Sequence, residues 1–251
     1  MIRAIILAAG FGTRLRPLTD HTPKPLLDVA GLPMIAYPLL LLRSAGISEA
    51  LINLHHLGEQ IRHALGDGSR YGVRITYSEE NPILDTGGAI KNAEGFLGGD
   101  TFVVLNADTI VDLDLPAMLA CHRGRGGIGT MLLREDPEVR RYGAIEVDVT
   151  DRVRRFLGFP AEVAEPLEPL MYGGVWILEP RVFEYMSPGV FSITKQTGPA
   201  LMRAGEALYG YRYGGYWRVL DTPDGLKAGR RDLQAKRLRF TGESAPRDRR
   251  R

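Results

Sequence analysis

The chain has 251 residues, of which 44% are hydrophobic and 25% are charged, a composition typical of a soluble globular protein. This composition excludes disordered and collagen-like chains, and the single cysteine, Cys121, has no partner for an internal disulfide. The longest apolar stretch lies near Pro38–Leu42 and is far shorter than the roughly 18 residues that cross a membrane. The N-terminal residues lack a signal-peptide pattern, so we expect a cytoplasmic protein with no membrane partner.

The net charge of +2 is distributed unevenly along the chain. Residues 230–251 carry nine Lys and Arg against three Asp and Glu, so this segment has a charge of +6 and residues 1–229 have −4. Such a polar C-terminal run is typical of a solvated terminus rather than of a nucleic-acid-binding arm. We therefore predict a folded domain over residues 1–232, a flexible basic tail over residues 233–251, and no nucleic-acid partner.

In the first half, short aliphatic runs alternate with helix-length segments. The runs that predict buried strands are Ile2–Ala8, Ala50–Leu54, Val73–Tyr77 and Phe102–Leu105. Between them, Met34–Ala45 and Gly58–Leu65 have helical periodicity, and Gly46 and Gly66 stand where helices end. This alternation of strand and helix predicts a mostly parallel sheet.

The second half has strand-like runs at hairpin or short-loop spacing. These runs are Gly129–Arg134, Gly143–Val147, Arg152–Phe156 and Tyr172–Leu178. The segments Pro180–Met186 and Thr197–Ala204 then predict helices. With no internal repeat and no linker-like composition, we predict one α/β domain with a smaller mixed-sheet subregion.

The first strand is followed by a glycine-containing loop within Leu7–Thr19. Ligands of open parallel sheets bind beyond the carboxyl ends of the strands, which is where this loop lies. Gly10 and Gly12 let backbone amides approach an anion, and Thr13 and Arg14 offer a hydroxyl and a planar guanidinium to phosphate oxygens. The loop therefore indicates a phosphate site, the alternative being a plain strand-to-helix connection.

Two common phosphate motifs are excluded by the same loop. It lacks the Gly-Lys-Ser/Thr ending of the nucleotide P-loop, and Leu15 stands where a dinucleotide-binding loop needs glycine. Arg16 supplies a further guanidinium, and Lys24 stands between Pro23 and Pro25, each of which fixes its own φ. These cations favour the phosphate site over the plain connection.

A second polar loop lies within Tyr77–Ile90. Thr86-Gly87-Gly88 predicts the start of a helix, and adjacent glycines there allow a flat ring to stack against bare backbone. The alternative is an ordinary capped helix, with Glu79 and Glu80 as solvated acids.

The third loop begins at Asn106-Ala107-Asp108, where an apolar strand delivers a carboxylate at its carboxyl end. Next to a phosphate site, Asp108 is the expected ligand for Mg²⁺, with water and phosphate oxygens completing the coordination. Alone, Asp108 would equally cap the next turn. The presence of Arg14 and Lys24 favours the metal role.

Together these motifs resemble the sugar-1-phosphate nucleotidyltransferases, over roughly residues 2–230. The pieces that carry the resemblance are Leu7–Pro17, Pro23–Leu26, Leu84–Ala89 and Asn106–Asp108, in this order. Within the family, the chain's length is similar to that of bacterial mannose- or heptose-1-phosphate guanylyltransferases and N-acetylmuramate-1-phosphate uridylyltransferases. The resemblance implies a Rossmann-like nucleotide-diphospho-sugar transferase fold and Mg²⁺ as cofactor.

The resemblance also implies roles for individual residues. The nucleotide-binding residues that it implies are Ala8, Ala9, Gly10, Gly12, Thr13, Arg14, Glu80 and Gly88. Ala8–Gly10 would line the base and ribose, Gly12–Arg14 would hold the triphosphate, and Glu80 would face the base edge with Gly88 beside it. Arg14, Lys24 and Asp108 form the implied catalytic set. Because the attacking group is already an anionic phosphate oxygen, positioning and charge neutralisation suffice without a general base.

Three places in the second half depart from the family pattern. Phe156–Pro160 replaces Phe-x-Glu-Lys-Pro, so two polar sugar contacts are absent, and Tyr172-Gly173-Gly174 replaces Asn-Ala-Gly. Val219 stands where the family has its second magnesium ligand. We expect Asp221, two residues further along, to supply that carboxylate from a shifted position. Lys195 would restore a positive charge for the sugar phosphate, the alternative being an exposed lysine at a helix start.

The sequence thus predicts a magnesium-dependent sugar-1-phosphate nucleotidyltransferase whose partners are a nucleoside triphosphate and a sugar 1-phosphate, in a chain that is a candidate homo-oligomer. A glutamate such as Glu80 accepts two hydrogen bonds from guanine but only one from uracil, which favours GTP with a manno-configured sugar. The alternatives are UTP or dTTP with another sugar such as N-acetylmuramate, a non-catalytic nucleotide-sugar-binding relative, and a nucleic-acid-binding protein that uses its basic tail.

Overall fold

The computed structural model describes residues 1–139 and 143–235. Its main sheet has the order β10-β9-β11-β6-β1-β4-β5, with β8 paired to β11 and β12 paired to β8. The strands are β1 (Arg3–Leu7), β2 (Asp28–Val29), β3 (Leu32–Pro33), β4 (Glu49–Leu54), β5 (Arg74–Glu79), β6 (Phe102–Asn106), β7 (Thr109–Val111), β8 (Gly129–Arg134), β9 (Ile145–Val147), β10 (Val153–Phe156), β11 (Glu168–Leu178), β12 (Leu208–Arg212) and β13 (Trp217–Val219).

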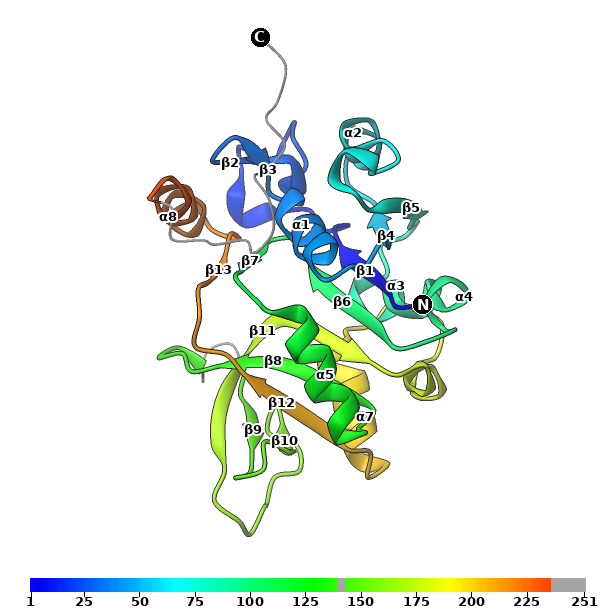
Figure 1. Ribbon diagram of the computed structural model, residues 1–251, viewed down its shortest axis with the longest axis vertical. Helices are drawn as coiled ribbons and strands as arrows, with labels where there is room; N and C mark the ends of the chain where they lie inside the picture. The colour runs from blue at the N-terminus through cyan, green and yellow to red at the C-terminus, as the bar shows by residue number, and fades with distance from the viewer. Residues whose placement is uncertain (140–142, 236–251) are drawn as a thin grey trace.

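Helices cover this sheet, and Figure 1 shows α1 and α5 in front of it. The α-helices are α1 (Ala36–Ser44), α2 (Gly58–Leu65), α3 (Asp85–Asn92), α4 (Glu94–Leu97), α5 (Leu115–Arg125), α7 (Gly198–Arg203) and α8 (Pro223–Gln234). Shorter helical turns are η1 (Thr13–Leu15), η2 (Lys24–Leu26), η3 (Ser69–Tyr71), η4 (Pro180–Tyr185) and η5 (Ile193–Thr197).

The first half is the predicted parallel arrangement. Strand β1 pairs in parallel with β4 and β6, and β4 pairs in parallel with β5. Ala4 and Ile6 face one core, with α1, α2 and α5, whereas Ile5 faces the other core, with α3, α4 and α7. Burial on both faces explains why the strand is a continuous apolar run rather than an alternating one.

The second half is mixed, as predicted. β11 runs antiparallel to β6, β8 and β9, while β12 is parallel to β8. The predicted helix at Pro180–Met186 is instead a 3₁₀ turn, and the prediction at Thr197–Ala204 corresponds to α7. Helix α8 extends two residues beyond the predicted domain boundary at 232, and residues 236–251 of the predicted tail lie outside the described part of the chain.

Two helices that the periodicity did not single out have clear local signals. The carboxylate of Asp114 accepts a hydrogen bond from the backbone N–H of Ala117 at 2.9 Å, and Gly126 ends α5 with φ of 65°. Thr222 caps α8 by accepting a bond from the N–H of Gly225 at 3.1 Å, and Pro223 follows it. Both starts are visible as cap residues in the sequence.

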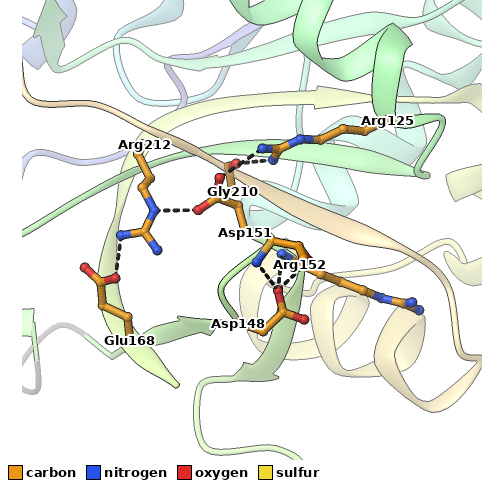
Figure 2. A network of polar contacts seen from close by, with 8 residues as sticks. Arg125, Asp148, Asp151, Arg152, Glu168, Gly210 and Arg212 are labelled. Atoms are coloured by element: carbon orange, nitrogen blue, oxygen red, sulfur yellow. Dashed lines mark hydrogen bonds and ion pairs between the residues drawn. The ribbon is translucent and has the colours of Figure 1, made fainter. Parts of the chain in front are cut away.

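The turn between β9 and β10 is fixed by a polar network around Asp151 (Figure 2). The Asp151 carboxylate accepts hydrogen bonds from Arg125 of α5 at 2.9 Å and from Arg212 of β12 at 2.5 Å. Arg212 also pairs with Glu168 of β11 at 2.5 Å, and the N–H of Gly210 donates to the Asp151 carbonyl at 2.8 Å. The hairpin is therefore bound to three other elements of the mixed half.

Within the described residues, no helix combines the length and the apolar character needed to cross a membrane.

Candidate nucleotide-binding site

A cavity of about 240 Å³ opens at the carboxyl edge of the parallel strands. All three polar loops singled out in the sequence contribute to its wall. Its lining residues are Leu7, Ala8, Ala9, Gly10, Lys24, Pro25, Met34, Asn53, Glu80, Ile83, Asp85, Thr86, Asn106, Ala107 and Asp108. The strand order explains this convergence, because β5, β4, β1 and β6 are successive neighbours whose carboxyl ends meet at one edge.

The first loop turns sharply at Gly12, which has φ of 63°. A Cβ atom there would lie 2.9 Å from the Cβ of Lys24 and 3.0 Å from a methyl carbon of Thr19, so no side chain fits. Ala8–Gly10 line the cavity, whereas Gly12, Thr13 and Arg14 lie beyond its described wall. The loop continues into the 3₁₀ turn η1 rather than into an α-helix.

Lys24 and Asp108 form an ion pair inside the cavity. The two prolines place Lys24 at the start of η2, and its side chain is only 13% exposed. Asp108 follows β6 directly, so the side chain of Lys24, from the segment after the first loop, meets one from the third loop. This arrangement places one cation and one carboxylate together where phosphate oxygens and a metal ion are expected.

A second ion pair lies beside the first loop, where Arg14 contacts Asp221 at 2.5 Å. The backbone N–H of Leu220 donates to the carbonyl of Asp108 at 2.8 Å, which brings the segment after β13 next to the third loop. Val219 pairs with Thr109 in the β13–β7 ladder. Asp221 therefore lies beside the first loop, paired with Arg14 on a segment next to Asp108, and it is not among the residues that line the cavity.

This donor set suits Mg²⁺ bound with substrate. Among the described residues, no group of three or more His, Cys, Asp and Glu gathers as a self-sufficient metal site. Asp108 and Asp221 instead offer carboxylate oxygens on neighbouring segments, and Mg²⁺ commonly binds through one or two carboxylates together with phosphate oxygens and water. The residues present therefore fit a metal ion that arrives with the triphosphate.

Glu80 lines the cavity but is almost fully buried, with 4% of its surface exposed. One carboxylate oxygen accepts from the side-chain amide of Asn53 at 2.8 Å, and the other accepts from the N–H of Leu84 at 2.8 Å. Asn53 in turn accepts from the N–H of Ala8 at 2.7 Å. Sequence analysis overlooked Asn53, although a polar residue in the otherwise buried apolar strand β4 was a visible signal.

Gly88 and its neighbour lie elsewhere than the ring-stacking hypothesis expects. A Cβ atom on Gly87 would lie 2.2 Å from the Phe191 ring, and one on Gly88 would lie 2.2 Å from the Gly189 carbonyl oxygen. The N–H groups of both glycines donate to the carbonyl of Phe191, at 2.8 and 3.1 Å. The glycines thus pack α3 against the segment 189–193, and neither belongs to the described wall of the cavity.

The segments that depart from the family pattern have structural roles. Phe156 is fully buried and stacks on Trp176, with ring centroids 6.0 Å apart, and the chain turns back after it at Leu157 and Gly158, both with positive φ. Gly174 interrupts β11 beside Thr109, whose hydroxyl oxygen would lie 2.8 Å from a Cβ there.

Lys195 lies in η5, is exposed and is not among the residues that line the cavity. The structure favours the view of this residue as an exposed lysine near a helix start. Asp85 and Asn106, which belong to the sequence motifs but were given no role there, also line the cavity, and Asp85 has φ of 58° at the start of α3.

Comparisons with known proteins agree with this fold. The family model described as "Nucleotidyl transferase" matches residues 3–234. A mannose-1-phosphate guanylyltransferase of Mycobacterium tuberculosis is 34% identical over 234 residues, covering 92% of this chain and 64% of the relative. An N-acetylmuramate alpha-1-phosphate uridylyltransferase of Neisseria meningitidis is 55% identical over 117 residues, covering 46% of this chain and 51% of the relative. The chain thus spans about half to two thirds of the length of these relatives.

Among solved structures, a candidate glucose-1-phosphate thymidylyltransferase of Bacillus anthracis superposes with a TM-score of 0.80. It is 25% identical and covers 97% of this chain and 100% of its own. The Rossmann-like nucleotide-diphospho-sugar transferase fold expected from the sequence is therefore confirmed.

Proposed function

Because this chain belongs to the nucleotidyl transferase family, we propose that it joins a nucleoside triphosphate to a sugar 1-phosphate and releases pyrophosphate. The observation that carries the proposal is the pairing of Lys24 with Asp108 in a cavity walled by the three polar loops. Asp221 and Arg14 add a second carboxylate and a second cation beside the phosphate-binding loop. The relatives carry names of this reaction class, which supports the same activity here.

In this reaction an oxygen of the sugar phosphate attacks the α-phosphorus of the triphosphate. A new phosphorus–oxygen bond forms, the bond to the β-phosphate breaks, and pyrophosphate leaves with its electrons. The ammonium of Lys24 neutralises charge on the reacting phosphates, and the guanidinium of Arg14 binds phosphate oxygens. The described cavity wall contains no His, Cys or Ser, in keeping with a reaction whose nucleophile is already an anion.

Asp108 and Asp221 are the residues that we propose hold Mg²⁺. When bound, the ion withdraws charge from the phosphate oxygens and helps to orient the triphosphate. Asp108 pairs with Lys24 and Asp221 pairs with Arg14, so each carboxylate lies next to a cation that we propose binds phosphate.

For the base, we propose UTP as the preferred nucleotide. The preference for GTP depended on a free Glu80 carboxylate, whereas both of its oxygens accept hydrogen bonds within the protein. The uridylyltransferase relative, at 55% identity over 117 residues, supports UTP with a sugar such as N-acetylmuramate. GTP with a mannose or heptose phosphate is the second candidate, supported by the guanylyltransferase that matches over 92% of the chain.

The test is pyrophosphate release in the presence of Mg²⁺, with UTP, GTP, dTTP, CTP and ATP each combined with N-acetylmuramate, mannose, heptose and glucose 1-phosphates. We expect release with UTP to exceed release with every other nucleotide. Preferred release with GTP would replace the first candidate by the second. If no combination releases pyrophosphate while calorimetry still detects nucleotide binding, the result would contradict catalysis and indicate a non-catalytic relative.

A further inference from the structure

A chain of hydrogen bonds through the side chains of Asn53 and Glu80, called the relay below, connects the ends of β1, β4 and β5. It lies at the edge of the sheet where we propose that the nucleotide binds. Backbone pairing between β1 and β4 runs from Ala4 and Ala50 to Ile6 and Ile52. Beyond that point, the side chain of Asn53 accepts from the N–H of Ala8 and donates to Glu80, which follows β5. The relay therefore continues the hydrogen bonding between β1 and β4 beyond the end of their backbone pairing.

The relay joins two of the loops that form the cavity wall. Ala8 opens the first loop, and Leu84 lies just before α3 in the second. Their backbone N–H groups are the two ends of the relay, at 2.7 Å from Asn53 and 2.8 Å from Glu80. The backbone of Glu80 is fixed as well, because its carbonyl contacts the His55 ring nitrogen at 2.8 Å and its N–H donates to Leu54 at 2.8 Å.

The direction of the hydrogen bonds explains why a carboxylate stands at position 80. The N–H of Ala8 must donate to the amide oxygen of Asn53, which turns the Asn53 amine toward Glu80. The N–H of Leu84 donates to Glu80 from the other side, so residue 80 has to accept at both oxygens. Only an acid does this, because a glutamine has one acceptor oxygen and would place a donor against a donor.

We propose that Glu80 and Asn53 are positioning residues that set the spacing of the two nucleotide-binding loops, and that Glu80 does not select the base. Both residues are only 4% exposed, which leaves little of the Glu80 surface for a ligand. The inference rests on the proposed function in that the ligand is a nucleoside triphosphate. It predicts that breaking the relay raises the dissociation constant of every nucleotide by the same factor.

The test measures dissociation constants for UTP, GTP and dTTP by calorimetry, with Mg²⁺ present, on the full chain. The single variants Glu80→Gln and Asn53→Asp each break the relay, and we expect both to raise all three constants by roughly 5- to 100-fold. The double variant Asn53→Asp/Glu80→Gln exchanges acceptor and donor, restores all three bonds with the middle one reversed, and should return each constant to within about threefold of the wild type.

A matched control is Glu79→Gln, which changes the neighbouring glutamate. Glu79 is 67% exposed and pairs with Arg62 on the surface, so the three constants should stay unchanged. Melting temperatures accompany every variant. If a single variant does not fold, the double variant still tests the relay, because its bonds are intact and it should fold and bind all three nucleotides.

Base reading by Glu80 would give a different pattern, in which Glu80→Gln weakens GTP much more than UTP and the double variant does not recover GTP. That result, or single variants that bind all three nucleotides with unchanged dissociation constants, would contradict the proposed positioning role of Glu80 and Asn53. The readout is binding, so loss of the relay is distinct from failure of the proposed reaction, which shows as absent pyrophosphate release by the wild type.

Discussion

Lys24 is the residue on which the proposed chemistry depends most. Replacing it with alanine removes the cation that faces Asp108 in the cavity, and we expect Lys24→Ala to lower kcat by about 100- to 1,000-fold. Pyrophosphate release under saturating substrates measures this. Lys91→Ala is the matched control, since Lys91 is 17% exposed and pairs with Glu94 away from the cavity. A near-normal kcat for Lys24→Ala would remove Lys24 from the mechanism.

A variant of Asp221 tests whether this residue supplies the second Mg²⁺ ligand in place of position 219. If its carboxylate holds Mg²⁺, Asp221→Asn raises the Mg²⁺ concentration for half-maximal activity by about tenfold or more. Activity titrated against Mg²⁺ gives this value. Asp20→Asn is the control, because Asp20 also pairs with an arginine of the first loop, Arg16, whereas the backbone hydrogen bond to Asp108 comes from Leu220, next to Asp221. If Asp221→Asn needs the same Mg²⁺ concentration as the wild type, Asp221 is not a metal ligand and its role is limited to the ion pair with Arg14.

At this scale, sequence patterns identified the residues whose chemistry is explicit, such as Lys24 between prolines and Asp108 at a strand end. They did not reveal that Glu80 is already satisfied, because its partners come from Asn53 and Leu84 on other segments. They also predicted that a flat ring of the ligand stacks against Gly87 and Gly88. These glycines instead make room for Phe191 and Gly189, more than 100 residues further along the chain.

At the scale of elements, the contact between α3 and the segment 189–193 supports the cavity wall. Gly87→Ala places a methyl group 2.2 Å from the Phe191 ring, so the segment must move, and we expect a loss of about 1–3 kcal/mol in the free energy of unfolding. Chemical denaturation measures it. Gly95→Ala in α4 is the control, since a Cβ there meets no atom within 4 Å and the change should be neutral or stabilising. Equal stability of the two variants would contradict this packing.

The elements themselves were predictable where periodicity was strong. Strands β1, β4 and β6 are almost wholly buried and their sequences are mainly apolar, as is typical of a parallel sheet covered on both faces. Strand β5 was expected to be buried as well, but it lies at the edge of the sheet, and Arg74, Thr76 and Glu79 are exposed. Helix α5 was missed because its sequence, LPAMLACHRGR, contains Gly124 and has no clear apolar stripe. Helix α8 was missed because only Leu226 and Leu233 face the small third core, so tertiary contacts decide it.

At the scale of the molecule, the end of the described chain returns to its beginning. Leu220 and Leu226 pack in one cluster with Leu15 and Met34, and the guanidinium of Arg230 donates to the carbonyl of Asp28 at 2.9 Å. This return carries Asp221 to the first loop. No local pattern predicts such a contact, because it depends on the pairing of β13 with β7, more than 100 residues apart in the chain.

The network in Figure 2 unites the mixed half, so its removal should affect the stability of the whole domain. Asp151→Ala removes the carboxylate that Arg125 and Arg212 share and keeps a side chain at φ of 63°, and we expect a loss of about 1–3 kcal/mol in the free energy of unfolding. Asp151→Gly loses the same bonds but relieves the backbone, so its loss should be smaller. Urea denaturation compares them, and a glycine variant less stable than the alanine variant would contradict the assignment of backbone strain.

The central claim is that the sugar phosphate attacks the α-phosphorus directly, with no intermediate on the protein. The most direct test is the stereochemistry of the transfer, measured by phosphorus NMR with a nucleotide that carries sulfur at a chiral α-phosphorus. A single in-line displacement inverts the configuration, and inversion is the result that we predict. Retention would require two displacements through a covalent nucleotidyl–protein intermediate and would contradict the mechanism.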